Sequence, residues 1–193
     1  MDTKQVTKFI KKLNAIDALG LSCLLIVAFI LQFTLHELPC PLCLLQRVGI
    51  LGIAFGFLLN VQFKIHPGHY TLSLIAALLT GMISVRQIFL HLLPGDPGYG
   101  LPFLGLHLYT WVFLFCFAVT IYIAIILSIS PQYTNLETEE IQGKSLSFLK
   151  QLAFAAVFLL TILNIISTYL ECGWKPCPDD PVKYQIQLIK PIS

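Results

Sequence analysis

Five long apolar runs dominate this sequence and limit what it can fold into. A membrane-crossing helix needs about 20 mostly apolar residues, and each run is close to that length or longer. The chain is 56% hydrophobic and only 11% charged, whereas soluble domains carry about 25% charged residues. We therefore expect an all-α integral membrane protein with five spans. The runs cover residues 18–35, 44–63, 70–93, 106–129 and 148–170.

The first run follows several lysines, as the apolar part of a signal peptide would. It is longer than such a segment, and no small-x-small cleavage site follows it, which favours a retained span.

Lysine and arginine are unevenly spread over the segments that connect the runs. Basic flanks stay in the cytoplasm. The N-terminal arm and the gaps after the second and fourth runs are basic, whereas gaps 36–43 and 94–105 contain neither residue. This alternation predicts a cytoplasmic N-terminus, a cytoplasmic connector at 131–147 and an outer tail at 171–193. Three lysines in the tail instead favour a cytoplasmic tail: Lys175, Lys183 and Lys190.

Two classes of partner are disfavoured by the sequence. The net charge is +2 and the basic residues are scattered, so no nucleic-acid-binding face is expected. A metal site is not expected either, because no second C-x-x-C or histidine pair completes a tetrahedral ligand set. The absence of C-x-x-C-H argues against covalently attached haem.

Cys40 and Cys43 lie three residues apart in the short gap between the first two runs. A C-x-x-C holds two sulfurs close enough to form and break a disulfide. Cys43 lies where the second span begins, so the helix N-terminus and Arg47, one turn further on, favour its thiolate form. The motif predicts redox chemistry at the membrane surface. A static structural disulfide is the alternative.

A second cysteine pair, Cys172 and Cys177, follows the fifth run directly. By the number of spans it lies on the same side as Cys40 and Cys43. It fits either a disulfide that fastens the tail or a redox pair that exchanges with the first through a mixed disulfide. Cys23 and Cys116 stand alone inside spans, where we expect them to pack as small apolar residues.

Polar side chains interrupt three of the runs at a similar depth near the outer surface. Such residues usually mark a functional cavity, although arginines also extend to lipid headgroups. A quinone is a lipid-soluble two-electron acceptor, and arginine and glutamine side chains would stabilise its reduced oxygens. The histidine of this set fits a proton carrier or an ordinary interfacial residue. The candidate binding residues are Gln32, Gln46, Arg47, Arg86, Gln87 and His91.

Residues 39–47, which read Pro-Cys-Pro-Leu-Cys-Leu-Leu-Gln-Arg, resemble the DsbB family of membrane quinone-linked thiol oxidases. Gln32 lies eight residues before Cys40, and residues 84–91 resemble the family's third-span motif. The likeness covers about residues 15–130. It implies a four-helix transmembrane bundle within residues 1–130, to which this chain adds a fifth C-terminal transmembrane helix.

The resemblance also implies a function, a location and roles for single residues. It implies a thiol:quinone oxidoreductase of the bacterial inner membrane. With the distribution of lysine and arginine described above, the N-terminus is then expected in the cytoplasm and the tail in the periplasm. Ubiquinone or menaquinone would oxidise the C-x-x-C, and a periplasmic DsbA-like thioredoxin-fold oxidase would supply the electrons. Cys43 would face the quinone, Cys40 would exchange with a second cysteine pair, and Arg47 would assist the quinone.

The chain departs from the family pattern in one respect. The family's second cysteine pair usually lies between the third and fourth spans, but residues 94–105 contain no cysteine. We therefore hypothesise that Cys172 and Cys177 replace it.

Three other functions compete with this reading. The first is an enzyme like vitamin K epoxide reductase, in which the C-x-x-C comes late in the core. The second is a carrier that exports reducing power, although such carriers keep paired cysteines within their spans. The third is a non-enzymatic membrane protein with structural disulfides.

Overall fold

The computed structural model describes residues 3–35, 37–100, 102–133, 144–179, 181 and 184–188, and these are all-α. Five of the helices are long and apolar enough to cross a membrane, which confirms the predicted fold class. Over the described residues the only β-type backbone pairing is an isolated bridge between Phe103 and Leu106. The helices are α1 (Thr3–Leu35), α2 (Pro41–Gln62), α3 (Pro67–Leu90), α4 (Leu108–Leu127), η1 (Ser130–Gln132), α6 (Lys144–Cys172) and η2 (Gln185–Leu188).

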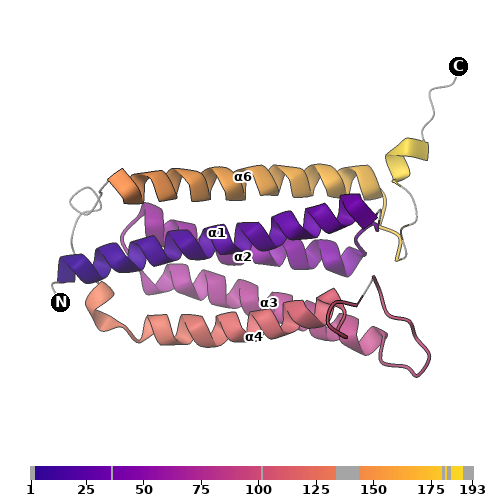
Figure 1. Cartoon of the computed structure of the whole chain (residues 1–193), viewed down its shortest axis with the longest axis horizontal. Coiled ribbons are helices and arrows are strands. Elements are labelled where there is room, and N and C mark those ends of the chain that lie inside the picture. The colour runs from indigo at the N-terminus through magenta and orange to yellow at the C-terminus, as the bar shows by residue number, and fades with distance from the viewer. Residues whose placement is uncertain are drawn as a thin grey trace, which may run out of the picture.

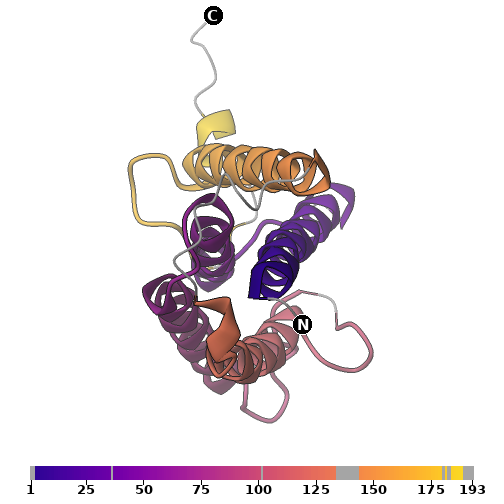
Figure 2. The ribbon, with the colours of Figure 1, turned by 90° about the vertical axis from the view of Figure 1, so that its left-hand side faces the viewer.

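The five long helices form an elongated bundle (Figure 1). In chain order α1 packs on α2, α2 on α3 and α3 on α4, while α6 packs on both α1 and α2. Viewed along the helices, α6 covers α1 and α2 from one side, and α3 and α4 lie on the other (Figure 2). The start of α2 and the ends of α1, α3 and α6 therefore meet at one end of the bundle (Figure 1).

Helix α1 begins at Thr3, well before the apolar run at residue 18. The hydropathy run marks only the part suited to lipid, whereas the preceding polar residues continue the same helix against the bundle. Lys11 donates from Nζ to the carbonyl oxygen of Phe63 at 2.7 Å. Asn14 donates to the Tyr70 hydroxyl at 2.8 Å, and that hydroxyl donates to Gln132 at 3.1 Å. Buried polar groups need such partners, and these fix the end of the bundle opposite the cysteines.

Helices α2 and α3 approach each other closely because glycine faces the contact. A Cβ placed on Gly56 would lie 2.6 Å from the carbonyl oxygen of His69 and 2.9 Å from the backbone nitrogen of Ser73. The Ser73 hydroxyl donates to the carbonyl oxygen of Ile53 at 2.8 Å, which joins the two helices. Small residues permit this kind of approach between membrane helices.

Gly56→Ala should therefore destabilise the bundle, because the added methyl group meets α3 backbone that cannot move independently. Overpacking of this kind costs about 1–3 kcal/mol, and thermal unfolding in detergent would report it. Gly20→Ala is the matched control, since a Cβ there meets no atom within 4 Å. Equal melting temperatures for the two variants would contradict the close approach of α2 and α3.

Candidate functional site

A cavity of about 370 Å³ lies between α1, α2 and α4 at the end of the bundle where α2 begins. Ligand pockets for small molecules have about this volume or more. Most of the wall is apolar, and the loop after α3 contributes to it. The polar side chains in the wall are Gln32, Glu37, Cys43, Gln46, Arg47, Tyr99 and Tyr109.

The start of α2 brings the sulfurs of the C-x-x-C to this cavity. Cys40 is the N-cap residue, with extended backbone, and Pro41 is the first helical residue, a position that proline favours. Cys40 and Cys43 form a disulfide. Cys43 lines the cavity, whereas Cys40 is buried outside it. The Cys40 sulfur accepts the backbone N–H of Cys43 at 3.1 Å, so α2 places its N-terminal donor on Cys40.

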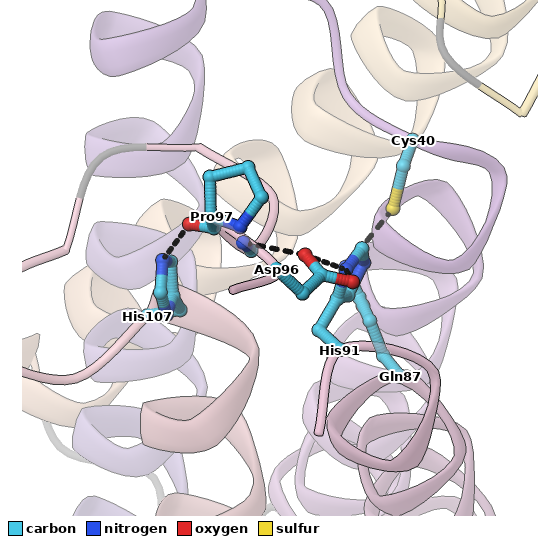
Figure 3. A network of polar contacts seen from close by, with 7 residues as sticks. Cys40, Gln87, His91, Asp96, Pro97 and His107 are labelled. Carbon is cyan, nitrogen blue, oxygen red and sulfur yellow. Dashed lines mark hydrogen bonds and ion pairs between the residues drawn. The ribbon is translucent and has the colours of Figure 1, made fainter. Parts of the chain in front are cut away.

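Gln87 of α3 reaches the sulfurs rather than the cavity. Its Nε2 donates to the sulfur of Cys40 at 3.2 Å (Figure 3). It also donates to the sulfur of Cys43 at 3.5 Å. Gln46 holds the amide in this orientation by donating to Gln87 Oε1 at 2.9 Å. Two of the predicted quinone-binding glutamines are thus brought together, but only Gln46 lines the cavity.

Arg47 points from α2 toward α1. Its Nη1 donates to Gln32 Oε1 at 2.7 Å, and its Nη2 donates to the carbonyl oxygen of Ala28 at 3.3 Å. The guanidinium carbon lies 4.7 Å from the centre of the Phe29 ring, within the range of a cation–π contact. Arg47 and Gln32 are both buried and both line the cavity. These two candidate residues therefore form a hydrogen-bonded pair in the cavity wall, which joins α2 to α1.

The structure does not bring Arg86 to the cavity. Its side chain is exposed on α3, while its neighbour Gln87 is buried. A helix turns by about 100° per residue, so Arg86 and Gln87 point in different directions from α3, and here only Gln87 points into the bundle. A common depth in the membrane was the reason to group Arg86 with the others, and depth alone does not specify the face.

His91 is the C-cap residue that follows α3, and it contacts the cavity wall through Tyr109. Its ring stacks on Tyr109, 5.7 Å between centres, and Tyr109 lines the cavity. His107 stacks on the same tyrosine at 5.3 Å. His91 Nδ1 lies 3.1 Å from Asp96 Oδ1 (Figure 3). The backbone N–H of Gly98 and the side chain of His91 hold the pKa of Asp96 below its usual value.

The second cysteine pair lies at the same end of the bundle, because α6 runs to Cys172 there. Cys172 and Cys177 form a disulfide. Cys172 is buried, whereas Trp174 within the same small loop is 92% exposed. The tail also contacts the wall of the cavity, since Gln32 Nε2 donates to the Tyr184 hydroxyl at 3.1 Å.

Several residues near the site were not singled out from the sequence. Tyr109, which lines the cavity, was not among the candidate residues. On α6 a buried polar stripe faces α1 and α2, and its spacing of three and four residues along the fifth run was the signal that would have revealed it. The stripe consists of Asn164, Ser167 and Glu171.

The unpaired cysteines differ from each other. Cys116 is buried, as predicted, but Cys23 is exposed on α1, so the prediction that it packs inside is wrong. In a membrane an outward apolar face meets lipid, and a small weakly polar side chain is tolerated there. Among the described residues no group of three or more His, Cys, Asp or Glu side chains could hold a metal ion.

Comparison with known proteins identifies the region that carries this site. The family model described as disulfide bond formation protein DsbB matches residues 11–100. Disulfide bond formation protein B of Chromobacterium violaceum is 39% identical over 88 residues, which are 40% of this chain and 51% of that protein. Disulfide bond formation protein B 1 of Pseudomonas putida is 35% identical over 79 residues, 39% of this chain and 45% of that protein.

The resemblance to the DsbB family is therefore confirmed over residues 11–100. The chain spans about half the length of the curated relatives it matches. Helices α4 and α6 and the second cysteine pair lie outside the matched residues. No solved structure matches the chain significantly.

Gln87→Leu should lower the reduction potential of the Cys40–Cys43 pair. The Gln87 amide stabilises a thiolate more than a neutral disulfide sulfur, so its loss disfavours the reduced form. A hydrogen bond to a charged group contributes about 1.5–3 kcal/mol, and about 30 mV corresponds to 1.4 kcal/mol for a two-electron couple. We expect a fall of about 30–60 mV in thiol–disulfide redox buffers. Gln62→Leu, at the other end of α2, is the matched control, and equal potentials would contradict the assigned contact.

Proposed function

We propose that this chain, which carries a DsbB-family region at residues 11–100, is a membrane thiol:quinone oxidoreductase. It would oxidise a periplasmic DsbA-like dithiol protein of the thioredoxin fold and pass the electrons to ubiquinone or menaquinone. One observation carries the proposal. A disulfide of the C-x-x-C type opens through Cys43 onto an apolar cavity whose wall contains a buried arginine and two glutamines.

The residues of the cavity suit a quinone. Its apolar wall accepts a ring and the first part of a prenyl tail, and it is built from helices that would face lipid. Arg47 is a fixed cation, and Gln46 has an amide N–H beyond the one donated to Gln87, which matches the ring oxygens on which negative charge develops during reduction. Arg47 and Gln46 would hold the ring oxygens, while Gln32, whose amide N–H groups go to Ser167 and Tyr184, would orient Arg47. The aromatic residues of α4 would exclude water.

The chemistry of the cysteines follows from thiol–disulfide exchange. A thiolate attacks one sulfur of the Cys40–Cys43 disulfide, and a mixed disulfide forms and resolves. The incoming dithiol becomes a disulfide, while Cys40 and Cys43 become thiols. Closing their disulfide again releases two electrons and two protons, for which a bound quinone supplies the acceptor. Cys43 faces the cavity, so we assign it to the quinone side and Cys40 to the exchange with incoming thiols.

We assign Cys172 and Cys177 to the relay between the partner protein and Cys40. Support comes from their disulfide, from their place at the same end of the bundle, and from the exposed loop that carries Trp174. A protruding loop of this kind suits contact with a soluble protein. In this proposal the protein lies in a bacterial inner membrane with the N-terminus in the cytoplasm and both cysteine pairs facing the periplasm.

Purified full-length protein with a reduced DsbA-like protein and a short-chain ubiquinone should show loss of oxidised quinone absorbance. Cys43→Ser should abolish this loss, because the cavity then lacks its reacting sulfur. Cys23→Ser, at the exposed unpaired cysteine, is the matched control and should keep the wild-type rate. Quinone loss that persists in Cys43→Ser would overturn the proposed reaction and leave a membrane protein with structural disulfides.

The same assay separates the relay from a structural disulfide. With Cys172 and Cys177 both changed to Ser, partner-driven turnover should fall at least about tenfold. Turnover driven by dithiothreitol should continue, since this small thiol does not need a protein relay to reduce the Cys40–Cys43 disulfide. Unchanged partner-driven turnover would contradict the relay role of Cys172 and Cys177, and electrons would then pass from the partner directly to the Cys40–Cys43 pair.

A further inference from the structure

A buried carboxyl group on α6 lies beside the proposed quinone site. Glu171 is fully buried, with 0% of its side chain exposed. Within the part of the chain that the structure describes, neither of its carboxyl oxygens has a hydrogen-bond partner. Burial of a carboxylate without a compensating charge is costly, and in a membrane helix such a residue marks a functional position.

The charge that faces Glu171 is Arg47. The two interact electrostatically across the contact between α6 and α2, and Tyr184 of the tail also interacts with Arg47. From α1 the neighbouring polar group is Gln32, which does not titrate. Arg47 therefore lies between the cavity and a buried acid of α6.

The same face of α6 holds the partner of Arg47 in place. Ser167, one turn before Glu171, accepts from Gln32 Nε2 at 3.1 Å, and Gln32 Oε1 accepts from Arg47 Nη1 at 2.7 Å. Helix α6 thus supports the Gln32–Arg47 pair by a hydrogen bond and by a charge. This helix lies outside residues 11–100, over which the chain matches the DsbB family.

We propose that Glu171 is a positioning residue for Arg47, and that the fifth helix thereby forms part of the quinone site. As a carboxylate, Glu171 balances the guanidinium and keeps it directed at the cavity wall. A protonated Glu171 loses that attraction, so quinone affinity depends on its charge. This inference rests on the proposed quinone function.

The chain offers a direct binding assay. It contains two tryptophans, of which Trp111 lines the cavity and Trp174 is exposed. In a full-length Trp174→Phe background, fluorescence reports Trp111 alone. Quenching by ubiquinone with a single isoprenoid unit then gives a dissociation constant without turnover.

Glu171→Gln should raise this dissociation constant about tenfold, because removing one member of a buried charge pair is strongly unfavourable. In the Trp174→Phe parent the dissociation constant should rise as the pH falls, until it approaches the value of Glu171→Gln. The dissociation constant of Glu171→Gln itself should not change with pH. Glu171→Asp keeps the carboxylate and should keep the pH dependence. Asp179→Asn removes an exposed acid of the tail and should behave as the parent.

The outcomes separate the two claims. Suppose that quinone quenches the parent, and that Glu171→Gln changes neither the quinone affinity nor its pH dependence. That result would overturn this inference alone. Loss of affinity in Asp179→Asn equal to that in Glu171→Gln would also overturn it, since the effect would then follow net charge. No quenching in the parent would overturn the proposed quinone function and this inference with it. Should Glu171→Gln not fold, loss of the pH dependence in Glu171→Asp would contradict the role of the carboxylate.

Discussion

The hydrogen bond between Arg47 and Gln32 is the interaction on which the end of the bundle that carries the cysteines depends. A guanidinium buried among membrane helices needs partners for its charge and its N–H groups. Gln32 and the carbonyl oxygen of Ala28 satisfy its N–H groups from α1, and Phe29 covers one face. Gln32 is held in turn by Ser167 and Tyr184 from the C-terminal part of the chain. One cation thus ties α1, α2 and α6 together beside the cavity.

The site joins this cation to a disulfide through the geometry of a single helix. Cys40, Cys43 and Arg47 lie in the first two turns of α2. The N-terminal backbone and Gln87 direct donors at the sulfurs, whereas Arg47 turns away to α1. The donors that reach the sulfurs and the cation that lines the cavity are therefore separate groups. Cys43 lies between them because it alone of the two cysteines reaches the cavity wall.

Much of this arrangement was predictable from the sequence. Hydropathy located the five spans, and the second run at residues 44–63 placed the C-x-x-C at the start of α2, which begins three residues earlier, at Pro41. Depth in the membrane correctly placed Gln32, Gln46 and Arg47 around one cavity but failed for Arg86, because depth does not specify the face of a helix. Averaged hydropathy also concealed the polar beginning of α1 and the acid on α6. The role of Glu171 depends on packing between distant segments, which no local pattern encodes.

The most direct test of this account is the redox state of each cysteine pair in intact membranes, with and without quinone. Alkylation of free thiols followed by peptide mapping distinguishes Cys40–Cys43 from Cys172–Cys177. The account predicts that both pairs are disulfides while oxidised quinone is present, and that both accumulate as thiols when the quinone pool is removed and the partner is reduced. A Cys40–Cys43 pair that stays a disulfide without quinone would contradict the claim that its electrons leave through the cavity.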